Sequence, residues 1–170
     1  MDKKLKKFTI ASSIIGDITI IFWKKENDII EEIILSNETE NSEKIALEKY
    51  GELEEGKVES FDKYLNDYLS GKKVDFSLDN LNLEKCSDFE KSVLIAEFKT
   101  DYGSTNTYSE LAEKINNPKS SRAVGNALAK NPFPVVIPCH RTIKKDKTIG
   151  NYTGGVKTKK KLLELEKNNI

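Results

Sequence analysis

The sequence predicts a mixed α/β chain (α+β) with two domains, residues 1–82 and 83–170. Runs rich in Ile, Thr and aromatic residues within the first 35 positions are typical of strands in a small antiparallel or mixed sheet. The second half instead carries helix start signals and apolar residues at helical spacing, which predict a mostly helical domain. The polar stretch 72–86 separates the two patterns and is expected to connect the domains.

In the first domain we expect a small sheet and one amphipathic helix. The helix has a single apolar face across Phe61–Leu69 and closes at Gly71. The acidic stretch 36–56 shows only weak helical character, around Glu43–Tyr50. The predicted strands, joined in part by a polar turn at 24–28, are Phe8–Ile10, Ile14–Trp23 and Ile29–Leu35. No recognisable catalytic pattern of titratable or nucleophilic residues occurs in this half, so we interpret it as a scaffold.

Two capping boxes begin the helices of the second domain. Ser87 with Glu90 predicts a helix up to Phe98, and Thr107 with Glu110 predicts another over Tyr108–Ile115. Gly103 separates the two helices. A tight turn at 116–118 and a third helix over 120–130 complete a helix-turn-helix pattern, which is typical of DNA-binding proteins.

The third helix is unusual for a recognition helix. It is rich in small residues, and Arg122 and Asn126 are its main long polar side chains. Small residues let a helix backbone approach DNA closely, as in shape-based docking or insertion into the duplex. The alternative is an ordinary core helix that packs through its alanines.

The charge of the chain is unevenly distributed. The formal net charge is zero, yet residues 1–85 carry −6 and residues 86–170 carry +6. A basic half favours a polyanionic partner such as nucleic acid, although a lysine-rich surface alone would give the same count. The two arginines, Arg122 and Arg141, both lie in the basic half, beside 26 lysines spread over the whole chain.

Composition excludes several classes of protein. No apolar run approaches the ~20 residues of a membrane span, so we expect no membrane partner. Two cysteines, Cys86 and Cys139, cannot form a disulfide framework, and with the single His140 they cannot build a Cys/His zinc site. The basic start Met1–Lys7 and the apolar stretch after it weakly imitate a secretory leader. Asp17 and three hydroxyl residues interrupt the pattern, so we expect a cytoplasmic protein.

The segment from Asn131 to Arg141, NPFPVVIPCHR, is the most informative stretch. Three of the four prolines lie within it, which predicts a stiff, extended and partly buried backbone. It ends with Cys139 beside His140 and Arg141, and a thiol next to cations is expected to have a lowered pKa and to act as a nucleophile. The alternatives are a structural cysteine in a buried strand, or a cysteine protease with its histidine placed opposite the thiol.

Two further segments complete the pattern. The loop at 150–155, GNYTGG, has three glycines and is suited to lining a pocket for a flat ligand. The closing helix over 158–167 contains Glu166, a carboxylate that could orient a histidine.

Taken together, residues 87–170 resemble the O6-alkylguanine-DNA alkyltransferase family, also called methylated-DNA–protein-cysteine methyltransferases. The resemblance rests on IPCHR at 137–141, with the flanking motifs Asn131-Pro132, RAVG at 122–125 and GNY at 150–152 in matching order. It implies a ribonuclease H-like N-terminal domain and a C-terminal winged helix-turn-helix domain. It also implies irreversible, single-turnover transfer of an alkyl group from O6-alkylguanine in double-stranded DNA, and possibly from O4-methylthymine, to a cysteine after base flipping. The resemblance further implies that the reaction needs no cofactor, metal or obligate protein partner, and that a monomer suffices.

The resemblance also assigns roles to residues. Cys139 would accept the alkyl group, His140 would take the thiol proton through a water, Glu166 would orient His140, and Tyr108 would donate a hydrogen bond to the guanine. Arg122 would fill the space left by the flipped base, and Asn131 would brace the turn before the active-site segment. The expected DNA-binding residues are Arg122, Thr107, Ser121, Ala123, Asn126, Asn131 and Arg141. The expected pocket residues are Tyr152, Thr153, Asn151 and Pro134.

Some features depart from the family pattern. Thr142 stands where an aliphatic residue is more usual, which predicts an altered pocket width. Lys161 replaces a bulky apolar residue of the last helix.

Two other functions are considered. A DNA-binding regulator or damage sensor would need longer side chains on its recognition helix. An unrelated thiol or redox enzyme would need a resolving thiol or a second histidine.

Overall fold

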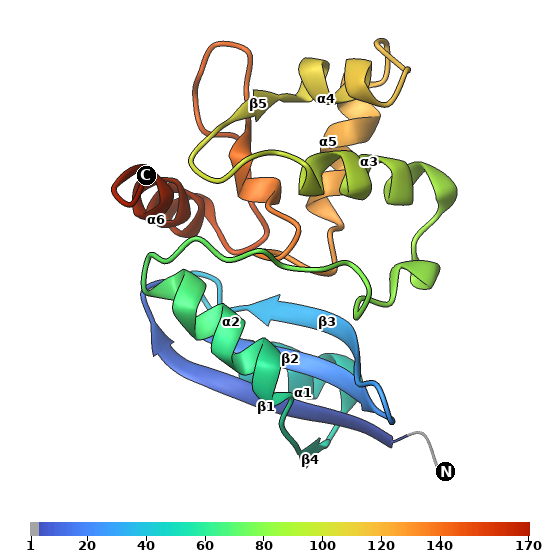
Figure 1. Ribbon diagram of the computed structural model, residues 1–170, viewed down its shortest axis with the longest axis vertical. Helices are drawn as coiled ribbons and strands as arrows, with labels where there is room; N and C mark the ends of the chain where they lie inside the picture. Colours follow the sequence, from blue (N-terminus) through green and yellow to red (C-terminus); the bar gives the residue numbers. More distant parts are fainter. Residues whose placement is uncertain (1–3) are drawn as a thin grey trace. The chain divides into compact units, whose positions relative to one another are not determined.

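A computed structural model describes residues 4–170 of the chain, so Met1–Lys3, the first part of the leader-like pattern, lie outside the described residues. The chain divides into two compact units, Met1–Asn82 and Leu83–Ile170, which are described separately below. Both units mix helices with short or long strands, so the chain has the predicted α+β character (Figure 1). In the described part of the chain, no helix has the length and apolar character that crossing a bilayer requires.

The N-terminal unit is built on a four-stranded sheet with the order β3-β2-β1-β4. Its antiparallel strands are β1 (Lys4–Ser13), β2 (Gly16–Lys24) and β3 (Ile29–Leu35), and β4 (Glu54–Glu55) adds a parallel pair to β1. The first hairpin turns at Ile14 and Ile15, where the sequence pattern predicted the start of a strand. Ser12, with φ 57°, and Gly16, with φ 88°, supply the left-handed backbone that this turn needs.

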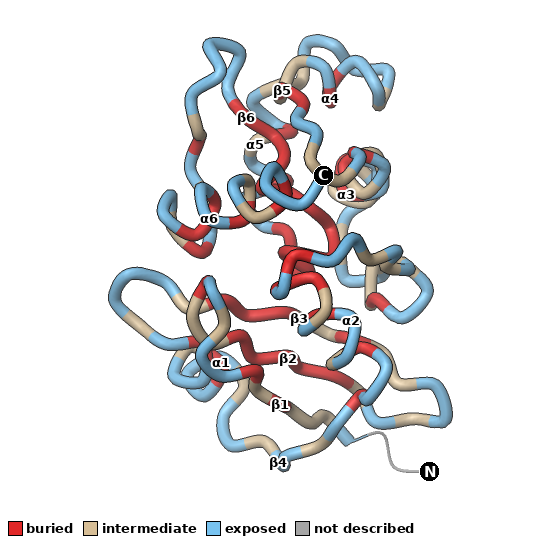
Figure 2. The backbone as a smooth tube through the Cα atoms, turned by 60° about the vertical axis from the view of Figure 1, so that its left-hand side comes forward, coloured by how far each residue is buried: buried red, intermediate tan, exposed pale blue. Residues whose placement is uncertain are grey.

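Two helices cover opposite faces of this sheet, α1 (Ser42–Tyr50) and α2 (Glu59–Leu69) (Figures 1 and 2). Ile21 and Ile34 of the sheet pack against Ala46 of α1, and the Thr19 hydroxyl bonds that of Ser42 at 2.8 Å. The middle of β2 is buried on both faces, which explains its continuous apolar sequence (Figure 2). The helix predicted at 61–69 is confirmed, and the weak helical signal near Glu43 corresponds to α1.

The C-terminal unit is mostly helical. Its helices are α3 (Asp88–Phe98), α4 (Tyr108–Lys114), α5 (Ser121–Ala129) and α6 (Val156–Lys167), with 3-10 turns η1 (Leu83–Lys85) and η2 (Cys139–Arg141). The unit also contains two short parallel strands, β5 (Asn106–Thr107) and β6 (Thr142–Ile143). Both predicted capping boxes are present at Ser87 and Thr107, so the starts of α3 and α4 are confirmed.

The sequence predicted an extended proline-rich segment. In the structure this segment instead makes a compact turn. The Ile137 N–H donates to the Phe133 carbonyl at 2.9 Å, and Val135 takes a left-handed conformation with φ 76°. A β-branched residue seldom adopts this conformation, and the surrounding structure must hold it there. The whole turn is buried. It is this turn that carries the chain from α5 into η2.

Candidate active site

Asn131 fixes the turn that presents Cys139. Its side-chain oxygen accepts the Phe133 N–H at 2.9 Å, while its amide nitrogen donates to the Ile137 carbonyl at 2.9 Å and to Cys139 Sγ at 3.1 Å. One buried side chain therefore closes the turn and holds the sulfur at the same time. The bracing role expected for Asn131 agrees with these contacts.

His140 points away from solvent, into a buried cluster that Glu166 organises. His140 Nε2 lies 2.7 Å from Glu166 Oε1, and both residues are fully buried. The Arg141 guanidinium binds both carboxylate oxygens of Glu166 at 2.9–3.1 Å and donates to the Thr100 carbonyl at 2.5 Å. The Gly103 N–H donates to Glu166 Oε2 at 3.0 Å. This network fixes the side chain of Glu166 and, through it, the imidazole ring.

The protonation states follow from this geometry. Burial works to raise the pKa of Glu166, but the hydrogen bonds from His140 and Arg141 outweigh it and hold the pKa well below its usual range. Burial lowers the pKa of His140, so its imidazole is neutral near pH 7. With an ionised Glu166 as acceptor, the ring proton lies on Nε2, which leaves Nδ1 as a proton acceptor. The His140–Glu166 pair is therefore arranged to accept a proton at His140 Nδ1.

The predicted lowering of the Cys139 pKa is wrong. Burial raises the pKa of the thiol to about 11, more than Asn131 and Lys159 lower it. Arg141, the cationic neighbour in the sequence, does not offset this effect on the thiol pKa, because its guanidinium is bound to Glu166. Cys139 is therefore a thiol at rest and needs a base to become a nucleophile.

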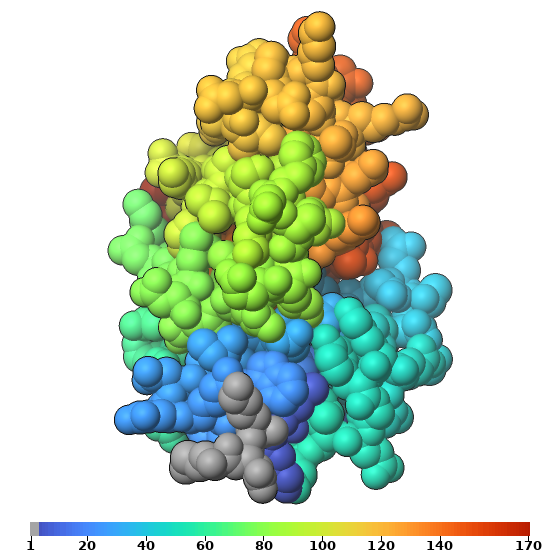
Figure 3. All heavy atoms as spheres, turned by 90° about the vertical axis from the view of Figure 1, so that its right-hand side faces the viewer, coloured from blue at the N-terminus to red at the C-terminus, as the bar shows by residue number. Residues whose placement is uncertain are grey.

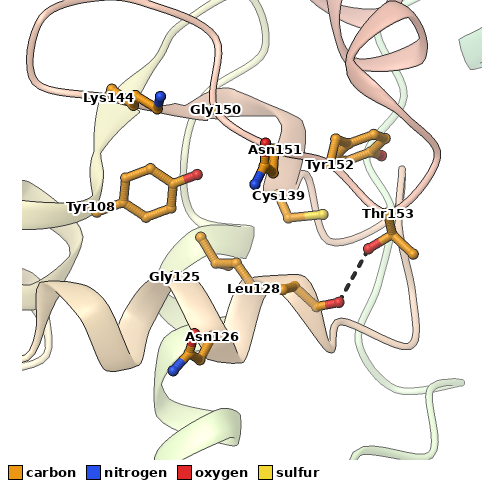
Figure 4. A pocket seen from close by; sticks show the side chains of 11 residues that line it. Tyr108, Gly125, Asn126, Leu128, Cys139, Lys144, Gly150, Asn151, Tyr152 and Thr153 are labelled. Atoms are coloured by element: carbon orange, nitrogen blue, oxygen red, sulfur yellow. Dashed lines mark hydrogen bonds between the residues drawn. The ribbon is translucent and has the colours of Figure 1, made fainter.

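The sulfur of Cys139 points into a cavity of about 510 Å³ (Figure 4). Tyr108 lies on one side of the cavity and Tyr152 on another, with the 150–153 loop between them. The Thr153 hydroxyl donates to the Ala129 carbonyl at 3.1 Å, which ties this loop to the end of α5. The remaining wall is formed by Gly125, Asn126, Leu128, Ala129, Lys144, Gly150 and Asn151.

Gly150 lets the Tyr108 hydroxyl enter the cavity. A Cβ atom at position 150 would lie 2.7 Å from the Tyr108 oxygen, a distance that side chains do not tolerate. The absence of a side chain, rather than an unusual backbone angle, is what the loop needs here.

Helix α5 buries one face and exposes the other. Val124, Ala127 and Leu128 face the interior, whereas Arg122, Ala123 and Asn126 are exposed. Figure 3 shows the residues near position 120 (amber) at the surface of this unit. A second hollow of about 380 Å³ is bordered by Thr107, Ser121, Arg122 and Lys144, next to Tyr108. A basic, exposed surface of small residues thus adjoins the cavity that holds the thiol.

Comparisons with known proteins identify the family of this chain. The DNA-binding domain of the 6-O-methylguanine DNA methyltransferases matches residues 88–168. The inducible methylated-DNA–protein-cysteine methyltransferase of Bacillus subtilis is 33% identical over 161 residues, which cover 94% of this chain and 84% of that protein. The chain belongs to the methylated-DNA–protein-cysteine methyltransferase family.

Two further methyltransferases show how far the similarity extends. The protein of Methanothermobacter thermautotrophicus is 46% identical over 99 residues, and the match spans 58% of this chain and about half (55%) of that relative. The crystal structure of Mycobacterium tuberculosis OGT in complex with DNA has a TM-score of 0.78 and 30% sequence identity, and it covers 96% of this chain and 94% of that one. These matches support the α+β fold. The finer ribonuclease H-like and winged descriptions remain predictions.

Four of the residues expected to contact DNA or the substrate have other positions or contacts in the structure. Arg141 was expected at the DNA surface, but it is buried and bound to Glu166. Asn131 is likewise buried beneath the sulfur, where its amide is used by the turn. Pro134 was expected in the substrate pocket, but it is buried in the turn and does not line the cavity. Thr107 caps α4 with its side chain and only borders the second hollow.

Two buried ionisable residues near the thiol, Glu97 and Lys159, were not predicted from the sequence. Both lie on apolar helix faces, Glu97 in line with Val93 and Leu94, and Lys159 one turn before Leu162. This periodicity was the available signal, because a charged residue on a buried face is rare unless it has a partner. Thr142 was expected to alter the pocket width. Its hydroxyl instead points to Glu97 and Asn106, away from the cavity lining.

Proposed function

We propose that this protein repairs O6-alkylguanine in double-stranded DNA by moving the alkyl group irreversibly onto Cys139. The observation that carries the proposal is a buried thiol at the wall of a cavity, next to a neutral imidazole whose orientation Glu166 fixes. The family membership and the DNA-bound relative from M. tuberculosis support DNA as the partner.

In the proposed reaction the base is flipped out of the duplex and enters the cavity beside Cys139. His140 Nδ1 takes the thiol proton, through a water, and the thiolate attacks the alkyl carbon. The S–C bond forms as the bond from carbon to guanine O6 breaks, and its electron pair moves to the guanine. The Tyr108 hydroxyl donates to the guanine as negative charge develops, while Tyr152, Thr153 and Asn151 line the base. The thioether has no leaving route, so each molecule reacts once.

On the DNA side, the exposed face of α5 would lie against the duplex. Arg122 would occupy the space of the flipped base, with Ser121, Ala123 and Asn126 beside the phosphate backbone and Thr107 near the rim of the second hollow. Residues 83–170 would carry the chemistry, and the first 82 residues would act as a scaffold. A reactive free thiol needs a reducing compartment, which supports the cytoplasm as its location.

The decisive test uses duplex DNA with a single O6-methylguanine that is isotopically labelled in its methyl group. We expect one label per protein molecule, on the peptide that contains Cys139, when the protein is digested and analysed by mass spectrometry. Cys139→Ser should bind the DNA without accepting the label. Cys86→Ser is the matched control and should accept it normally, because Cys86 lies outside the cavity.

The other outcomes identify the alternatives. Tight binding of damaged DNA without labelling would favour a damage sensor. A label on Cys86, or on Cys139→Ser protein, would contradict the assignment of the nucleophile.

A further inference from the structure

A buried polar cluster lies next to the transfer site, and the mechanism above does not use it. It consists of Glu97 at the end of α3, Asn106 on β5, Thr142 on β6 and Thr100, all of them buried. Thr142 Oγ1 lies 2.6 Å from Glu97 Oε2 and also contacts Asn106 Oδ1. The Asn106 amide nitrogen lies 2.8 Å from Thr100 Oγ1 and 3.3 Å from Glu97 Oε2. Asn106 and Thr142 are register partners in the β5–β6 pair.

Counting the hydrogens in this cluster bears on the protonation state of Glu97. The Thr142 hydroxyl has one hydrogen but touches two oxygens that would both be acceptors if Glu97 were ionised. With the Asn106 amide oriented as in this structure, each contact has a hydrogen of its own only if Glu97 Oε2 donates to Thr142 and Thr142 donates to Asn106. The Asn106 amide then donates to Thr100, and the chain of donors is complete. The geometry therefore favours a proton on Glu97.

The surroundings of Glu97 agree with a neutral carboxyl. The side chain is fully buried, and within residues 4–170 its Oε1 has no hydrogen-bond partner. A buried carboxylate with an open oxygen would be costly, whereas a neutral acid costs much less. Burial raises the pKa of Glu97 above its usual value, more than the hydrogen bonds and nearby cations lower it. The titratable or charged groups near enough to interact with Glu97 are Arg141, Lys114, Lys159, Cys139 and Tyr108.

Thr142 links this cluster to the nucleophile. It follows directly after η2, the turn that carries Cys139 and His140, and its carbonyl accepts a hydrogen bond from the buried Lys159 Nζ at 2.6 Å. A shift of Thr142 would therefore move both the turn and Lys159. In addition, a negative charge on Glu97 would oppose the formation of a thiolate at Cys139, because the two groups interact electrostatically.

We propose that Glu97 is a positioning residue of the transfer site that works as a neutral carboxylic acid, donating its proton to Thr142 and leaving the Cys139 sulfur without an opposing charge. This inference deepens the proposed function and rests on it for the meaning of the site. The measurements below follow the thiol alone, so they do not depend on DNA repair.

The test uses a Cys86→Ser background, in which Cys139 is the only cysteine. The rate of its alkylation by iodoacetamide as a function of pH gives the pKa of the thiol. Glu97→Gln is always neutral and similar in shape, so we expect the thiol pKa to stay within about 0.3 units of the parent. If Glu97 were ionised, removing its charge would lower the thiol pKa by about one unit or more, which would overturn the proposal.

The positioning role is tested with variants that remove the donor or its partner. Glu97→Leu and Thr142→Val both break the hydrogen bond, and we expect each to slow alkylation of the thiolate about tenfold. Glu97→Gln, which can still donate to Thr142, should recover the rate to within about threefold of the parent. Equal rates in all four proteins would overturn the role. Because Glu97→Leu could fail to fold, Thr142→Val provides the second, nearly isosteric variant.

Infrared spectroscopy reads the proton directly. At neutral pH the parent protein should show the C=O stretching band of a protonated carboxyl, and this band should be missing in Glu97→Gln. If the two spectra are the same in this region, Glu97 carries no proton and the proposal is wrong. A protein that passes these tests but transfers no methyl group from DNA would disprove the proposed function and leave the state of Glu97 established.

Discussion

Neighbours in the sequence can have different electrostatic roles from those that their order predicts. Cys139, His140 and Arg141 are consecutive, and their order predicted a thiol activated by cations. In the folded chain Glu166 binds both the histidine and the arginine, so the cationic charge is neutralised and the thiol keeps its proton. The nucleophile could be predicted from the residues. Its resting state could not, because that depends on a carboxylate 27 positions later in the chain.

The contact between Gly150 and Tyr108 gives a prediction at the residue scale. Gly150→Ala would place a methyl group 2.7 Å from the Tyr108 oxygen and push the hydroxyl away from the base. We expect about a tenfold slower transfer from methylated duplex DNA, since a hydrogen bond to developing charge is weakened. Single-turnover kinetics with the labelled duplex would measure this.

Gly125→Ala is the matched comparison for this variant. Its Cβ would lie 3.6 Å from the same tyrosine ring, an ordinary contact, so the loss should be clearly smaller. If Gly150→Ala transfers at the parent rate, Tyr108 is not the donor.

At the scale of elements, local signals predicted the helices well and the active-site turn poorly. Capping boxes at Ser87 and Thr107 depend on side chains three residues apart, and both are present. The turn at 133–137 instead depends on two hydrogen bonds of Asn131 and on a left-handed Val135, which no residue preference predicts. The prolines predicted an extended chain, but the chain turns at Val135, which lies between two of them.

Helix α5 gives a prediction at the same scale. Arg122 is exposed on a helix whose other outward residues are mostly small, so it is the side chain with the reach to enter a duplex. Arg122→Ala should slow transfer from duplex DNA by about tenfold or more, while reaction with free O6-benzylguanine stays nearly unchanged, because the free base need not be flipped. Parallel rate measurements on the two substrates test this.

Arg122→Lys separates insertion from simple attraction to phosphate. A lysine keeps the charge but lacks the flat guanidinium, so it should recover only part of the lost rate. Equal slowing of both substrates by Arg122→Ala would show that the variant damages the site itself.

On the scale of the whole chain, residue patterns correctly predicted a sheet-based first half and a helical second half. The apolar strands and the cap signals carry this information. Strand β4 was missed because Glu54 and Glu55 have no apolar pattern, and ion pairs to Lys4, Lys6 and Lys7 accompany its pairing with β1. Glu97 and Lys159 were missed for a related reason, since charged residues are assigned to the surface by default.

The neutral carboxyl proposed for Glu97 means that folding takes up a proton. The unfolded chain releases this proton near pH 4.3, about the ordinary value for Glu, whereas the folded chain keeps it to higher pH. Between these two values the folded state binds more protons, so raising the pH lowers the free energy of unfolding by up to about 1.4 kcal/mol per unit. Glu97→Gln lacks this pH-dependent contribution to the free energy of unfolding. The contribution of the ionised Glu166 is the same in both proteins. Urea unfolding from pH 5 to 8 should therefore give stability curves that diverge as the pH rises, with the variant losing less stability than the parent toward the alkaline end. Parallel curves would mean that Glu97 enters the fold already ionised.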